Sequence, residues 1–502
     1  MVSVTTLPQF RRPIKRIALV VVCVLLCILA AGAVIAHHFW PYGELSVRSR
    51  LAKIASTNVR FGRFHEKYFP PGCVAENVIF QRDTSGPPLI SIKKLVIRSN
   101  LRGILGGRVS VVRAEGMHVI LSRDDFSGNR SSDKQTTVGK LVADDAVLEV
   151  HRKGGTQPLR FVFHKFRLEN LGGSGATRFA AVFENPMPAG MVRTSGQFGP
   201  WNSSDPAATT VSGKYSLENA DLAVFESIAG KIFSQGDFKG TFKQMEIEGA
   251  TTTPDFEVTS THHKLPLQTH FSAAVNARSG ETILRKVKAN FGRDEIDAQG
   301  RIGRDLHGKQ AAIIELTCNR GRIEDTFYPF IQSPKSPLTG NVAFQMHIVI
   351  PSGRTRFLKK LELRSIFNIT DTRFSNPQTQ SRLNKISEGP DQKEPDETVL
   401  VNLTGQVTLL KGIAQFARLS ARDGDASALF HGSYDLTNER VNMHGNLKTE
   451  ASLTKTTSGI KAVFAKALEP LFKKGRHAKV IPVRISGTFH HPSFGLDMNS
   501  NM

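Results

Sequence analysis

The sequence predicts a mainly β protein: a long, curled, groove-like antiparallel sheet with a few helical insertions, preceded by one N-terminal transmembrane helix. Three observations lead to this fold class. Apolar and polar residues alternate past residue 75, glycines recur inside the alternating segments, and residues 17–36 form one uninterrupted apolar stretch. Of the 502 residues, 40% are hydrophobic and 22% are charged, which is typical of a folded chain and excludes wholesale disorder.

The apolar stretch, residues 17–36, reads IALVVVCVLLCILAAGAVIA. A helix of about 20 such residues spans the hydrocarbon core of a bilayer. Four cations between Arg11 and Arg16 precede it. Because Lys and Arg favour the cytoplasmic side, residues 1–16 are expected in the cytoplasm and the bulk of the chain across the membrane. A cleaved signal peptide is the competing interpretation, but its apolar region is normally about 7–15 residues long, so we expect a single-pass anchor.

The chain is strongly basic, with a formal net charge of +22. Such a charge favours anionic lipid head groups or anionic polysaccharide as contacts, and it fits a solvated basic surface equally well. Nucleic acid is not expected as a partner, because the anchor places most of the chain across the membrane. Four cysteines exclude a disulfide framework and a multi-zinc protein. Cys73 and Cys318 either pair or remain free thiols.

Alternation with a period of two is clearest at residues 342–350 (VAFQMHIVI), 441–448 (VNMHGNLK) and 483–490 (VRISGTFH). It predicts strands with one apolar and one solvated face. Within such strands an apolar-x-Gly-x-apolar pattern recurs, and we expect its glycines to let the sheet curl. Glycines at ordinary hairpin ends are the alternative. The glycines are Gly213, Gly240, Gly300, Gly340, Gly405, Gly432, Gly445 and Gly487.

Helical spacing of apolar residues predicts helices at 44–57, 219–233, 322–331 and 457–472. Residues 376–398 are polar and contain three prolines, which predicts a linker. The expected organisation is therefore a β-rich region at 37–375, the linker, and a second β region at 399–502 that continues the same sheet.

No catalytic constellation is found in the sequence. Gly303, Gly308 and Lys309 have phosphate-loop spacing, but Gln310 stands where a magnesium-binding Ser or Thr is needed. No nucleophile elbow or zinc-binding HExxH sequence occurs. We therefore expect no enzyme activity, no cofactor and no metal.

Three segments resemble the AsmA-like family of bacterial envelope proteins, to which the larger TamB and YhdP are related. They are residues 59–82 (VRFGRFHEKYFPPGCVAENVIFQR), 212–240 (SGKYSLENADLAVFESIAGKIFSQGDFKG) and 466–497 (KALEPLFKKGRHAKVIPVRISGTFHHPSFGLD). The most specific is the I-x-G-T-x-x-x-P-x-F-G-L-D run at residues 485–497. The resemblance implies an inner-membrane anchor, a periplasmic β-rich groove, and a role in outer-membrane assembly or phospholipid movement. The larger relatives are far longer, so a partial conduit fits this chain better than a complete bridge.

Apolar side chains of the predicted strands are the candidates for lining a groove that shelters lipid acyl chains. They are Phe161, Phe163, Phe242, Phe344, Ile348, Phe430, Met443, Ile485 and Phe489. A closed sandwich core would show the same alternation, so both arrangements remain open. The expected partners are inner-membrane lipid, phospholipid or another envelope lipid, and outer-membrane assembly proteins. A scaffold that aids outer-membrane protein insertion without lipid transport is the alternative function, and an envelope hydrolase is a weaker one.

Overall fold

The computed structural model describes most of the chain from residue 40 onward. The described ranges are 40–55, 57–82, 88–100, 103–104, 107–122, 137–151, 158–202, 204–225, 228–259, 261–276, 279–304, 310–326, 328–330, 336, 338–351, 357–374, 401–423, 426–438, 440–449, 480–488 and 492–497. The predicted transmembrane helix at 17–36, the linker at 376–398, the helix at 457–472 and Phe489 lie outside them. The chain divides into two compact units, unit 1 with residues 1–156 and 169–172, and unit 2 with residues 157–168 and 173–502.

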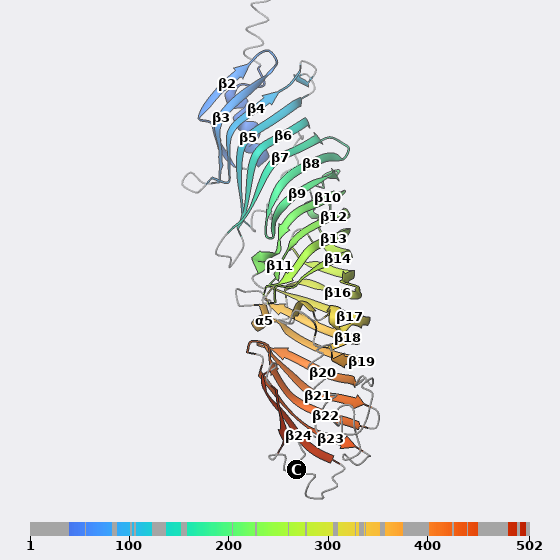
Figure 1. The fold of residues 1–502 in the computed structure, drawn as a ribbon. Coiled ribbons are helices and arrows are strands. Elements are labelled where there is room, and N and C mark those ends of the chain that lie inside the picture. The colour runs from blue at the N-terminus through green and yellow to red at the C-terminus, as the bar shows by residue number, and fades with distance from the viewer. Residues whose placement is uncertain are drawn as a thin grey trace, which may run out of the picture. The chain divides into compact units, whose positions relative to one another are not determined.

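The described part of unit 1 is a small sheet with one helix (Figure 1). Its elements are α2 (Glu44–Ala55), β1 (Asn58–Arg60), β2 (Arg63–Lys67), β3 (Gly72–Gln81), β4 (Ile90–Arg98), β5 (Arg108–Ser122) and β6 (Thr137–His151). The predicted helix at 44–57 is confirmed as α2, which buries Val47. β5 and β6 pair in parallel, which corrects the prediction of a wholly antiparallel sheet. A parallel pair needs a crossover connection, and the local alternation of residues carries no information about strand direction.

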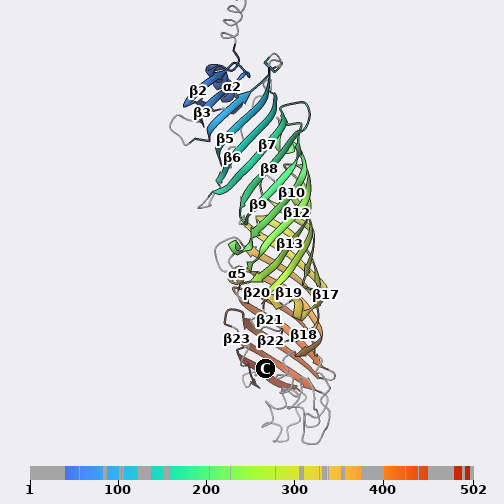
Figure 2. The ribbon, with the colours of Figure 1, turned by 45° about the horizontal axis from the view of Figure 1, so that its top comes forward.

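Unit 2 is an open antiparallel sheet whose strands follow one another in chain order (Figures 1 and 2). β7 (Leu159–Leu171) contains residues of both units. The other strands are β8 (Thr177–Pro186), β9 (Ala189–Phe198), β10 (Thr210–Asp221), β11 (Ile228–Ala229), β12 (Lys231–Thr241), β13 (Met245–Val258), β14 (Lys264–Val275), β15 (Thr282–Phe291), β16 (Asp294–Arg304), β17 (Gln310–Arg322), β18 (Leu338–Pro351), β19 (Glu362–Phe374), β20 (Val401–Leu410), β21 (Ile413–Asp423), β22 (Ala426–Asp435), β23 (Arg440–Thr449), β24 (Val480–Thr488) and β25 (Pro492–Leu496). Short helical turns are η2 (Pro206–Ala208), η3 (Leu222–Phe225), α4 (Ile323–Thr326), η4 (Tyr328–Phe330) and α5 (Phe357–Lys360).

The strands on either side of the predicted linker pair with each other. β19 and β20 form an antiparallel ladder that includes Phe367 opposite Gly405. The prediction that the C-terminal strands continue the same sheet is therefore confirmed.

The predicted helix at 219–233 is wrong. The segment contains the end of β10, the single turn η3, the short strand β11 and the start of β12. Asp221 accepts a hydrogen bond from the backbone N–H of Ala223 and pairs with the Lys231 ammonium at 2.6 Å, which fixes a turn. Pairing of β10 with β12 outweighs the helical spacing of the apolar residues.

The predicted helix at 322–331 is confirmed only in part. Arg322 ends β17, and the segment then forms α4 and η4, each of one turn. α4 is held by Asp294, whose carboxylate accepts hydrogen bonds from the Arg322 N–H at 3.0 Å and the Thr326 hydroxyl at 2.6 Å.

Candidate functional site

One face of the unit 2 sheet is apolar along its length, because the strand registers align similar side chains. We define this apolar face by two registered rows. The first row contains Phe179, Gly196, Gly213, Phe238, Ile247, Ala273, Leu284, Gly300, Ile314, Ile348, Leu363, Leu409, Ala414, Tyr434 and Val441. The second row contains Ala181, Thr194, Tyr215, Gly236, Gly249, Phe271, Val287, Ala298, Leu316, Met346, Ser365, Val407, Phe416, Gly432, Met443 and Ile485.

The opposite face is polar and solvated. On β12, for example, Phe238 is half-buried, whereas its neighbours Asp237 and Lys239 are exposed. Successive side chains of a strand point to opposite faces, so this pattern separates an apolar surface from a wet one across the thickness of a single sheet.

The apolar face is not equally accessible along its length. Between β20 and β24 it contains a buried cluster, in which Leu447 and Val483 are fully covered. Between β8 and β17 most of its large side chains are only half-buried, among them Phe238, Ile247 and Phe271. The buried clusters of unit 2 are each built from consecutive strands and the turns beside them. The half-buried part between β8 and β17 is therefore the part that a ligand can contact.

Aromatic rings on this part of the face extend over glycines of the neighbouring strands, which leave room for them. Phe179 and Phe238 flank Gly196 and Gly213 in the first row. Two strands, β9 and β10, lie between the strands of the two phenylalanines, yet the ring centroids are only 6.4 Å apart. A Cβ atom on Gly213 would lie 2.7 Å from the Phe238 ring, so a larger residue there would displace the ring.

The second row repeats the arrangement one step along the strands. Tyr215 and Phe271 flank Gly236 and Gly249. A Cβ on Gly249 would lie 2.7 Å from the Tyr215 hydroxyl and 3.1 Å from the Phe271 ring. The Tyr215 hydroxyl shares a hydrogen bond of 3.2 Å with Ser234, and burial raises the pKa of Tyr215 above its usual value. The phenol therefore stays neutral at physiological pH.

The predicted groove residues occupy three kinds of position. Ile348 and Ile485 are half-buried on the apolar face, and Phe161 and Phe163 of β7 contact Phe183 with centroid distances of 6.2 and 4.9 Å. Phe344, Phe430 and Met443 are each only 6% exposed and belong to buried clusters. Phe242 lies in the turn after β12, where it contacts Phe198.

The predicted glycines also fall into two groups. Gly213, Gly300, Gly405, Gly432 and Gly445 lie inside strands, opposite large apolar side chains of the neighbouring strands. Gly240, Gly340 and Gly487 lie near strand ends and have positive φ values of 134°, 154° and 99°, and Gly432 inside β22 also has a positive φ, of 149°. Sequence reasoning missed Gly196, Gly236 and Gly249, which only the register reveals as partners of the aromatic rings.

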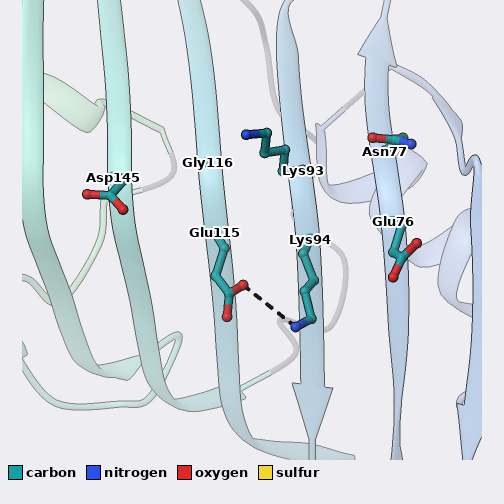
Figure 3. A pocket seen from close by; sticks show the side chains of 7 residues that line it. All are labelled: Glu76, Asn77, Lys93, Lys94, Glu115, Gly116 and Asp145. Atoms are coloured by element: carbon teal, nitrogen blue, oxygen red, sulfur yellow. Dashed lines mark ion pairs between the residues drawn. The ribbon is translucent and has the colours of Figure 1, made fainter.

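Unit 1 contains a polar hollow of about 440 Å³ on its sheet (Figure 3). Its lining places two lysines of β4 among acidic side chains of β3, β5 and β6, and Lys94 and Glu115 form an ion pair at 3.7 Å. Asn77, Gly116 and Asp145 line it with φ values of 50°, 60° and 52°, so left-handed residues of three strands coincide there. Such residues bend strands locally, and we interpret the hollow as a product of that bending.

Cys73 and Cys318 are both buried free thiols, and burial raises the pKa of the Cys73 thiol to about 12. Among the described residues, no group of three His, Cys, Asp or Glu side chains is placed to hold a metal ion. In the same part of the chain, no helix is both long and apolar enough to cross a membrane.

Comparison with known proteins gives no relative. No family model, curated protein or solved structure matches the chain.

Proposed function

We propose that this protein is a single-pass protein of the bacterial inner membrane whose periplasmic sheet binds or conducts phospholipid and so supports outer-membrane assembly. One observation carries the proposal. The apolar face of unit 2 is continuous through consecutive strands and remains half-exposed between β8 and β17.

Water should be displaced from such a face by a ligand that is itself long and apolar. Each CH₂ group removed from water contributes about 0.8 kcal/mol, so an acyl chain lying on the face gains stability with every methylene it buries. The aromatic rings over Gly213 and Gly249 add apolar contact area. The acyl chains of a phospholipid fit this chemistry.

A conduit also requires continuity from strand to strand. Neighbouring strands lie about 4.8 Å apart, so the nine strands from β8 to β17, with β11 set aside, extend the accessible face by roughly 40 Å along the sheet. Register shifts interrupt several ladders, for example between Leu284 and Val287 of β15, and such bulges increase local bending and twist. Curling of the sheet toward the apolar side would turn the face into a groove.

The location follows from the N-terminus. The apolar stretch at 17–36 and the cations before it support an inner-membrane anchor with the bulk of the chain in the periplasm. The resemblance to AsmA-like proteins supports the same location and the same ligand class.

A scaffold that aids outer-membrane protein insertion is the second candidate. Within the described residues β25 pairs only with β24, and an unpaired strand edge can receive a strand of another protein. Co-purification of outer-membrane assembly proteins without bound phospholipid would favour this candidate.

The phospholipid proposal is tested with two matched substitutions on β13. Ile247 lies on the apolar face and Glu248 on the polar face, and both are replaced by Lys in the full-length chain. After washing in a detergent free of phospholipid, the lipid bound per protein is measured by mass spectrometry. We expect Ile247→Lys to lose bound phospholipid and Glu248→Lys to retain it, because only the first places a charge in the acyl-binding surface. Equal lipid content in the two variants and the native chain contradicts the proposal, since lipid around the anchor alone would then explain it.

A further inference from the structure

The turn between β2 and β3 presents an apolar tip to solvent. Tyr68 is 51% exposed and Phe69 is 93% exposed, the largest value among the exposed large hydrophobic residues of the described chain. Pro70 follows and is exposed as well. An isolated exposed apolar residue needs no explanation, but three in succession at the end of a turn form a protruding surface.

The base of this turn is firmly held. The Tyr68 ring packs against Trp40 with 5.0 Å between centroids, and Trp40 in turn contacts the buried Tyr42 at 6.0 Å. The carbonyl of Pro71 accepts a hydrogen bond of 2.7 Å from the backbone N–H of Ser99, which directly follows β4. The tip is therefore presented by a fixed support, with the Phe69 side chain exposed to solvent.

Charges at the base of the tip suit an anionic surface. Lys67 lies opposite Gly72 in the β2–β3 ladder, and Arg98 lies opposite the same residue in the β3–β4 ladder. Both are exposed. Glu66 is the acidic residue nearest the tip, and its carboxylate accepts a hydrogen bond of 3.3 Å from the Tyr68 hydroxyl. An apolar tip with cations behind it matches the boundary between head groups and acyl chains.

Chain connectivity indicates which surface the tip contacts. The apolar stretch ends at Ala36, four residues before Trp40. Four residues extend at most about 14 Å, so Trp40, and the tip that packs on it through Tyr68, cannot lie far from the membrane that the stretch enters.

We infer that the Tyr68-Phe69-Pro70 tip inserts into the head-group region of the bilayer that holds the anchor, and so fixes the orientation of unit 1 on that membrane. The inference rests on the membrane anchor of the proposed function. It adds a second point of contact, which restricts rotation of unit 1 about the chain that joins it to the span. Phe69 is the inserted side chain, and Lys67 and Arg98 face lipid phosphates.

The test uses the full-length chain reconstituted in phosphatidylcholine vesicles that contain brominated lipid, which quenches tryptophan only on contact. Trp40→Phe and Trp201→Phe remove both native tryptophans. Phe69→Trp then supplies a single probe at the tip, and Gln235→Trp supplies the matched control at an exposed position on the polar face of β12. Flotation after alkaline carbonate reports on the anchor separately, and circular dichroism confirms the fold of each variant.

We expect both variants to float, the tryptophan at 69 to lose most of its emission in brominated vesicles, and the one at 235 to lose none. Flotation without quenching at 69 overturns the inference and leaves the anchor intact. A blue-shifted but unquenched emission at 69 also overturns it, because a protein partner or a second copy then covers the tip. Failure to float overturns the anchor of the proposed function and the inference with it.

Discussion

Glycine and aromatic residues act as pairs across the strands of unit 2. Phe238 lies over Gly213, Phe367 over Gly405 and Phe430 over Gly445, each in register with its glycine. A glycine opposite an aromatic ring gives the ring room to lie on the backbone, which shields the glycine from water and offsets its poor fit in a strand.

Replacing Gly249 by Ala is expected to destabilise unit 2. The new Cβ would lie 2.7 Å from the Tyr215 hydroxyl and 2.8 Å from the Gln235 carbonyl oxygen, so side chain and backbone must both shift. Overpacking of this kind costs about 1–3 kcal/mol. The measurement is urea unfolding in a Trp40→Phe background, in which Trp201 reports on unit 2.

Gly175→Ala is the matched control. Nothing lies within 4 Å of a Cβ at that position, so its unfolding midpoint should stay the same or rise. If both substitutions move the midpoint equally, the glycines are not needed to seat the aromatic rings.

Two aspartates should give unit 2 opposite responses to pH. Asp294 is 3% exposed, and burial raises its pKa above the usual range. Hydrogen bonds from the Thr437 hydroxyl and N–H hold the pKa of Asp435 below the usual range. A raised folded-state pKa stabilises the fold when the group is protonated, and a lowered one stabilises it when the group is ionised.

The predicted readout is the unfolding free energy of Asp294→Asn and Asp435→Asn relative to the native chain. As pH falls from neutral to about 4, the native chain should gain stability relative to Asp294→Asn, because protonation removes the cost of burying the charge. Relative to Asp435→Asn it should lose stability only as pH falls further, below about 4, because the pKa of this hydrogen-bonded carboxyl lies below the usual value for Asp. Parallel pH profiles for both variants would show that burial of Asp294 has no energetic consequence.

Among the elements, the segment of α4 and η4 connects parts of unit 2 that are distant in sequence. The Tyr328 ring stacks on His263 with 4.1 Å between centroids and 3° between planes. The Thr261 hydroxyl donates a hydrogen bond of 2.6 Å to the Pro329 carbonyl. The connection after β17 is therefore tied to the turn between β13 and β14.

Thr261→Val should loosen this segment. Val keeps the shape of Thr but leaves the Pro329 carbonyl without its donor, at a cost of about 1–3 kcal/mol. Hydrogen exchange of residues 323–330 should become faster while exchange in β21–β23 stays unchanged. Thr437→Val removes a hydroxyl bond of the same length at an exposed turn, and it should leave exchange in 323–330 as it was.

The sequence predicts strands better than it predicts their connections. Alternation identifies β18, β23 and β24 because each has one apolar and one wet face. The segment at 219–233 misleads, because its apolar residues have helical spacing while the pairing of β10 with β12 decides its conformation. The sequence of a single strand also does not determine its register with the next strand. The alignment of Gly196 with Gly213 and of Gly236 with Gly249 is therefore visible only in the structure.

At the scale of the molecule, the division into two units near residues 156–173 has no counterpart in the predicted organisation. Both sides of the division are strand-rich, so composition does not change there. The predicted candidate residues were chosen by apolarity alone, and the structure separates those that are buried, such as Phe344 and Phe430, from those that are only half-buried, such as Ile348. Accessibility depends on neighbouring strands and cannot be read from alternation.

The central claim is that acyl chains lie on one face of the unit 2 sheet and not on the other. The most direct measurement places a photo-reactive phenylalanine analogue, one position at a time, at Asp237, Phe238 and Lys239 of β12 and at His270 and Phe271 of β14 in the full-length chain. We predict phospholipid adducts at Phe238 and Phe271, on the accessible part of the apolar face, and none at the other three positions. Adducts of equal yield on both faces, or on neither, would contradict the claim.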